Sequence, residues 1–71
     1  MYLKNVLASR MKLAEIGQVE LAKKVGVNVS TLNKKINGSV EFKLREIQRI
    51  ADVLDLTDQD IISIFFADEV A

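Results

Sequence analysis

The 71-residue sequence contains no cysteine and no histidine. Without cysteine there is no disulfide framework and no thiolate metal site, and without histidine the other usual zinc ligand and the most common general base are missing. The acidic pairs Asp58/Asp60 and Asp68/Glu69 are typical of a helix start and a tail. We therefore predict that the protein is not an enzyme and has no catalytic residues, no metal site and no cofactor.

Proline and long apolar runs are absent as well. No proline interrupts a helical pattern, and no apolar run approaches the roughly 20 residues of a membrane span. The start of the chain lacks the basic and apolar regions of a signal peptide. Hydrophobic residues make up 49% of the chain with only four aromatics, which predicts an aliphatic core. We expect a single small domain over residues 1–71, cytoplasmic and without membrane contact.

Opposite charges are separated along the chain, although the net charge is zero. Residues 1–43 hold eight basic and three acidic side chains, a net of +5, whereas residues 44–71 hold two basic and seven acidic ones, a net of −5. A clustered positive charge attracts phosphate. We interpret the chain as a dipole whose basic end suits nucleic acid; the alternative is that these are ordinary solvated surface charges.

Two short helices joined by a turn are predicted within residues 18–37. In the first helix Leu21, Ala22 and Val25 form the stripe by which one helix leans on another. Gly26 follows at the point where the helix must end in a left-handed conformation, which glycine adopts without steric cost. The pattern therefore predicts a tight turn at this glycine.

The second helix is predicted to begin at about Val29, with Asn28 as its cap and Val27 packing onto Leu32. Leu32 and Ile36 lie one turn apart and face inward. The outer face is then polar and cationic, and it consists of Ser30, Asn33, Lys34 and Asn37. A short helix, a glycine turn and a second helix with a polar outer face form a helix-turn-helix motif.

This stretch resembles the lambda-repressor-like family, the Cro/CI-type (XRE) regulators of phages and bacteria. Their pattern is similar to Gln-x-x-Leu-Ala-x-x-x-Gly-Val-x-x-x-Thr-Leu-x-x-x-x-Asn-Gly, and the matching residues are Gln18, Leu21, Ala22, Gly26, Val27, Thr31, Leu32, Asn37 and Gly38. The resemblance implies an all-α, five-helix domain whose second motif helix enters the major groove of DNA. The chain departs from the family at Gly17 and Lys43, where relatives often have serine or threonine.

The same resemblance implies a small phage regulator of the lysis–lysogeny switch that binds double-stranded operator DNA in a bacterial host cell. The residues expected to contact base edges are Val29, Ser30, Asn33 and Lys34. The residues expected to contact backbone phosphates are Gln18, Asn28, Asn37, Ser39 and Lys43.

Three further helices are predicted, over residues 2–14, 44–55 and 58–66. Phe42 is expected to anchor the loop that precedes the helix over residues 44–55. In that helix Leu44 is expected to begin the apolar stripe, and Glu46 is expected to lie outside the stripe. The predicted core consists of Leu7, Leu21, Ala22, Val25, Leu32, Ile36, Phe42, Ile47, Ile50, Ala51, Leu54, Ile61 and Phe65.

The last helix carries more apolar surface than one core would cover. Its five large apolar side chains spread over roughly 200° of arc, about twice the stripe that a surface helix buries. We expect Ile62, Ile64 and Phe66 to face a second copy in a homodimer or a phage CI-type repressor, or to be covered by the tail over residues 67–71. This surface, the zero net charge and the lack of arginine on the second motif helix leave a second interpretation, an antirepressor or modulator that binds a partner repressor.

Overall fold

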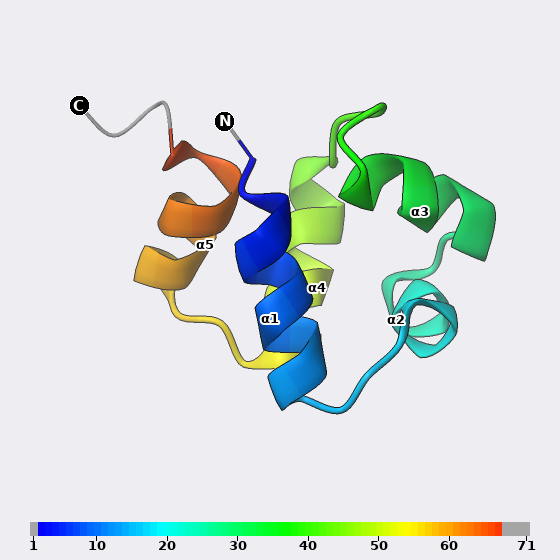
Figure 1. Ribbon diagram of the computed structural model, residues 1–71, viewed down its shortest axis with the longest axis horizontal. Helices are drawn as coiled ribbons and strands as arrows, with labels where there is room; N and C mark the ends of the chain where they lie inside the picture. The colour runs from blue at the N-terminus through cyan, green and yellow to red at the C-terminus, as the bar shows by residue number, and fades with distance from the viewer. Residues whose placement is uncertain (1, 68–71) are drawn as a thin grey trace.

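Five α-helices and no strands make up residues 2–67, which are the residues that the computed structural model describes (Figure 1). In chain order the helices are α1 (Lys4–Leu13), α2 (Gln18–Val25), α3 (Val29–Ile36), α4 (Leu44–Leu54) and α5 (Asp58–Phe65). The predicted all-α, five-helix architecture is confirmed. The first helix begins two residues later than predicted, so Tyr2 lies outside it. Over residues 2–67, none of the helices has the length and apolar character needed to cross a membrane.

Helices α2 and α3 lie together at one side of the molecule, and α2 packs against α4 (Figure 1). Gly26 ends α2 with a φ of 88°, and its amide donates to the Ala22 carbonyl at 2.9 Å. This left-handed conformation strains residues that carry a Cβ atom. Asn28 then caps α3, because its Oδ1 accepts a hydrogen bond from the Thr31 amide at 3.1 Å. Both predicted turn features are therefore confirmed.

One aliphatic core cluster draws side chains from all five helices. Every member of the predicted core is buried except Phe42 and Ile61, which are half-buried and pack against the cluster. Met11 and Ile16 also belong to the cluster. The prediction that Leu44 faces inward was wrong, because its side chain is 64% exposed. At about 100° per residue, Leu44 lies roughly 70° from the middle of the buried stripe of α4.

The apolar surface of α5 is mostly covered within the chain, which corrects the predicted interface. Ile64 is only 1% exposed and belongs to the core, and Phe66 packs half-buried against it. Ile62, at 37% exposed, is the member of the predicted set that faces outward. The reason is that α5 contacts both α1 and α4, and two neighbouring helices bury a wider arc than one.

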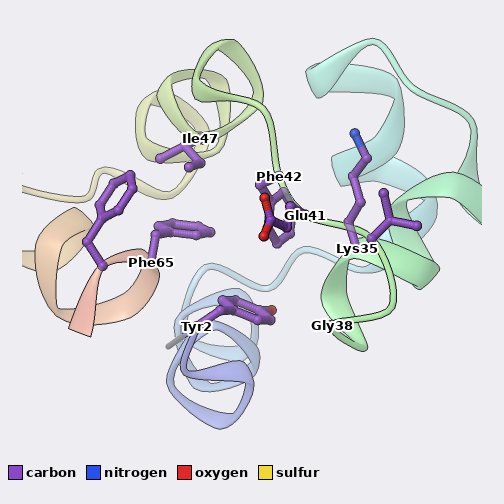
Figure 2. A pocket seen from close by; sticks show the side chains of 9 residues that line it. Tyr2, Lys35, Gly38, Glu41, Phe42, Ile47 and Phe65 are labelled. Atoms are coloured by element: carbon purple, nitrogen blue, oxygen red, sulfur yellow. The ribbon is translucent and has the colours of Figure 1, made fainter. Parts of the chain in front are cut away.

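Three aromatic rings join the N-terminal segment, the loop after α3 and α5. The ring centroids of Tyr2, Phe42 and Phe65 lie 5.2–5.7 Å apart, in one stacked and two edge-to-face pairs (Figure 2). The Leu3 amide adds a hydrogen bond to the Ile64 carbonyl at 2.7 Å. Phe42 therefore anchors its loop as predicted. The rings form part of the wall of a cavity of about 270 Å³.

The Tyr2 hydroxyl is enclosed in this region, and no protein group within residues 2–67 forms a hydrogen bond with it. Burial disfavours the phenolate and raises the pKa of Tyr2 from 10.0 to about 12. Tyr2 is the one tyrosine of the chain and there is no tryptophan, so tyrosinate absorbance reports on this residue alone. We expect the absorbance titration to have its midpoint near pH 12 in the folded protein and near pH 10 in urea.

The same shift predicts the direction of alkaline destabilisation. Because the pKa is higher in the folded state, the unfolded chain loses its proton first, and stability falls as pH rises from 10 to about 12. Tyr2→Phe should remove this part of the pH dependence, as measured by urea denaturation of both proteins. A folded-state midpoint at the ordinary tyrosine value would contradict the burial of the hydroxyl.

Candidate nucleic-acid interface

The outer face of α3 carries the side chains that the sequence predicted to be exposed. Ser30, Asn33, Lys34 and Asn37 are all exposed, whereas Leu32 and Ile36 are buried beneath them. Val29, at the start of the helix, is 43% exposed. The helix therefore presents a polar, cationic surface with one aliphatic side chain at its N-terminal end. Such a surface contains hydrogen-bond donors, hydrogen-bond acceptors and an apolar side chain. These are the three kinds of group that contact base edges in the major groove.

The N-terminus of α3 is organised by the Asn28 side chain. Its Oδ1 accepts hydrogen bonds from the Thr31 amide at 3.1 Å and from the Ser30 hydroxyl at 2.7 Å. The Asn28 oxygen is thus occupied, so its amide NH₂ is the group that can donate to a phosphate. The Ser30 hydroxyl uses its proton locally, so its oxygen can act as an acceptor for a donor outside the protein.

A chain of three side-chain amides crosses the motif from the start of α2 to the end of α3. Asn33 Nδ2 donates to Gln18 Oε1 at 3.0 Å, and Asn37 Nδ2 donates to Asn33 Oδ1 at 3.0 Å. The structure therefore brings together two predicted phosphate contacts and one predicted base contact. The chain holds Asn33 by both ends of its amide group. Each of the Asn33 polar atoms keeps capacity for one more hydrogen bond.

Two other predicted contacts, Ser39 and Lys43, lie between α3 and α4. The Ser39 amide donates to the Lys34 carbonyl at 3.0 Å, which holds this loop against the last turn of α3. Lys43 is exposed and stands at the cap position of α4 without a cap bond from its side chain. Its amide instead donates to Glu46 Oε1 at 2.7 Å. The Lys43 ammonium is thus not needed to start the helix.

A buried ion pair next to this face was missed by sequence analysis. Lys35 Nζ lies 2.5 Å from both carboxylate oxygens of Glu46, and the two residues are 5% and 3% exposed. Burial alone would raise the pKa of Glu46, but hydrogen bonds from the Lys35 ammonium and the Lys43 amide, together with the positive charges of both lysine side chains, outweigh burial and lower the pKa. The expectation that Glu46 lies on the polar side of its helix was wrong.

A signal for this pair was present in the periodicity. Lys35 follows Leu32 by three residues, and Glu46 precedes the buried Ile50 by four, so both lie at the edge of an inward stripe. The pair also changes the charge count, because Lys35 does not contribute to the exposed positive surface. Lys34 and Lys43 are the exposed cations nearest to Lys35 in the chain. Among the residues described, no group of three or more histidine, cysteine, aspartate or glutamate side chains could hold a metal ion.

Comparison with known proteins agrees with this geometry. Residues 6–67 match a family described as the Cro/C1-type HTH DNA-binding domain. The match includes α2, the Gly26 turn, α3 and both ion-pair partners. Neither curated proteins nor solved structures gave a match. The chain belongs to the Cro/C1-type helix-turn-helix family of DNA-binding domains.

Proposed function

We propose that the protein is a phage-type transcription regulator that binds a specific operator sequence by placing α3 in the major groove. The observation that carries the proposal is the amide chain, because it holds a polar residue of α3 in a defined orientation on an otherwise exposed face. In a helix-turn-helix protein the second helix contacts base edges while the first meets the backbone. The phage setting rests on the resemblance to small Cro-type regulators.

Asn33 has the hydrogen-bonding capacity to recognise adenine. Its amide donates one hydrogen bond to Gln18 and accepts one from Asn37, which leaves one N–H and one acceptor lone pair. Adenine offers a matching acceptor and donor at N7 and N6 in the major groove. Lys34 can donate to the guanine O6 and N7 acceptors, and Val29 can contact a thymine methyl group. We assign Ser30 to the remaining base contact.

Backbone phosphates would be held on both sides of α3. At the start of α2, Gln18 uses its oxygen for Asn33 and keeps its NH₂ group for a phosphate oxygen. Asn28 likewise keeps its NH₂ group. At the other end of α3, Asn37, Ser39 and Lys43 supply an amide, a hydroxyl and an ammonium group.

Replacing Lys34 with alanine is expected to weaken specific binding by about 1–3 kcal/mol while changing non-specific binding little, because a base contact adds to the preferred site alone. The operator would first be selected from random-sequence duplexes with the purified protein. Fluorescence anisotropy with the selected duplex and an unrelated duplex then gives both affinities. Both should fall with salt by roughly 0.9 log unit per log unit for each phosphate neutralised.

Lys12→Ala is the control, since it removes the same charge from the exposed face of α1, outside the motif. It should affect the two duplexes equally. If Lys34→Ala also weakens both duplexes equally, Lys34 contacts phosphate rather than a base. A wild-type protein that selects no sequence would contradict the proposed function.

The partner-directed interpretation loses one of its three supports in the structure, because Ile64 is buried in the core. The zero net charge and the absence of arginine from α3 remain. Light scattering of the protein alone, and mixed with a purified phage CI-type repressor, separates the states. A homodimer predicts a palindromic operator with half-sites about one DNA turn apart. Association only with the repressor would favour the antirepressor function.

A further inference from the structure

The end of α3 lies beside the start of α4 (Figure 1), and a buried polar contact connects the two helices. Lys35 and Glu46 are the two charged residues that are buried within residues 2–67, and their side chains are 6% and 4% exposed. A buried ion pair usually contributes no more stability than an apolar pair of similar volume, because both charges must be desolvated. The stability of the fold therefore does not explain why charges occupy these two positions.

The Glu46 carboxylate connects three segments at once. It accepts from Lys35 Nζ at 2.5 Å and from the Lys43 amide at 2.7 Å. Lys35 is adjacent in sequence to Lys34, whose carbonyl also accepts the Ser39 amide at 3.0 Å. The Glu46 carboxylate thus joins the last turn of α3 to the first turn of α4, and the Ser39 amide separately holds the loop to α3.

We propose that Lys35 and Glu46 are positioning residues for DNA recognition, which hold the base-reading turn of α3 in register with Lys43 at the start of α4. The inference rests on the proposed function, in which Lys34 reads a base and Lys43 binds a phosphate. An apolar pair could fill the same space, but it could not accept a hydrogen bond from the Lys43 amide. It also lacks the directional hydrogen bonds that fix how far α3 is rotated about its own axis. The pair acts on sequence discrimination through Lys34 and Lys43 and does not itself contact DNA.

The test is the double variant Lys35→Met/Glu46→Leu, which keeps the volume and removes both charges. We expect it to unfold at a urea midpoint close to that of the wild type, since apolar pairs commonly replace buried ion pairs without loss and this offsets the missing acceptor for the Lys43 amide. Affinity for the selected operator should fall by about tenfold or more. Affinity for an unrelated duplex, which depends on the Lys43 phosphate contact but not on the Lys34 base contact, should fall less, so the ratio of the two affinities should fall.

The control is an ion pair between α1 and α5, away from the motif, which also joins a cation to a carboxylate at a helix start but whose side chains are 34% and 28% exposed. Arg10 Nη2 lies 2.5 Å from Asp60 Oδ2, and Asp60 accepts from the Thr57 amide at the start of α5 at 3.0 Å. Arg10→Met/Asp60→Leu should leave the ratio of specific to non-specific affinity unchanged. A loss of discrimination in this control equal to that in the test variant would show a general effect of ion-pair removal and overturn the proposal.

Rescue by a conservative pair separates positioning from packing. Lys35→Arg/Glu46→Asp keeps the charges, and Asp60 in α5 demonstrates that an aspartate at this helix position reaches the cap amide. Discrimination should return toward that of the wild type. If Lys35→Met/Glu46→Leu does not fold, Lys35→Leu/Glu46→Met, which likewise has no side-chain group to accept the Lys43 amide, takes its place with the same criterion.

Two failures can be told apart. A wild-type protein without sequence preference would remove the proposed function and this inference with it. A wild-type protein with a preference that the uncharged double variant retains would contradict only the positioning role of the pair.

Discussion

Replacing Leu32 with alanine is expected to lower the free energy of unfolding by about 2–5 kcal/mol. Leu32 is 0% exposed, and it belongs to the core cluster on α3, the helix that packs against α2. The substitution removes buried apolar volume, and the rigid turn at Gly26 limits how far the two helices can close the space. Urea denaturation followed by circular dichroism gives the change from the midpoint and slope.

Leu44→Ala is the control for this prediction, because it makes the same change at a side chain that is 64% exposed. Surface substitutions usually change stability by no more than about 0.5 kcal/mol. Equal midpoints for the two variants would mean that α2 and α3 are not packed through Leu32. A loss confined to Leu32→Ala would confirm that the motif belongs to the same cooperative unit as the core.

The helix-turn-helix was predictable because its determinants are local. Gly26 and Asn28 act on backbone groups only a few residues away, so their types and spacing indicate both the turn and the new helix. The inward positions of Leu32 and Ile36 follow from helical periodicity alone. The five-helix architecture was predictable from the apolar stripe of each helix and from the family resemblance, with clear start or stop signals at α2, α3 and α5.

The features that were missed depend on residues far apart in the sequence. Ile64 is buried because α5 lies against both α1 and α4, and the arc of one helix cannot reveal how many neighbours it has. Tyr2 was assigned to a helix because its ring contacts, Phe42 and Phe65, are distant in the chain. Long-range packing, rather than local propensity, decided both positions.

The candidate site likewise contains some features that local sequence predicts and others that depend on long-range packing. Exposure of Lys34 and the other residues on the outer face of α3 follows from periodicity. The hydrogen bond from Asn33 to Gln18 joins residues on different helices, so it depends on how α2 and α3 cross. Glu46 was placed on the polar side because a single charged residue on a helix is usually solvated, and its partner Lys35 lies on another element.

Replacing Lys35 alone with methionine is expected to destabilise the protein by about 3–5 kcal/mol at neutral pH, more than removal of both charges would. The single change leaves the Glu46 carboxylate buried at 3% exposure without its ammonium partner. Stability of the wild type and the variant would be measured by urea denaturation over a series of pH values. The double variant Lys35→Met/Glu46→Leu, which buries no charge, should be the more stable of the two variants.

The difference in stability between the wild type and Lys35→Met should depend on pH in a defined direction. In the wild type the pKa of Glu46 is lowered below its ordinary 4.5, so the stabilisation is present above pH 4.5 and is lost as pH falls through the folded-state pKa. In Lys35→Met, burial without the ammonium raises the pKa, so this variant gains stability from protonation as pH falls. The difference between the two proteins should therefore be largest at neutral pH and shrink in acid. Lys34→Met, at the exposed neighbouring position, is the control, and its stability should differ little from that of the wild type at any pH. A loss of stability in Lys35→Met that does not vary with pH would mean that the ion pair is not buried as described.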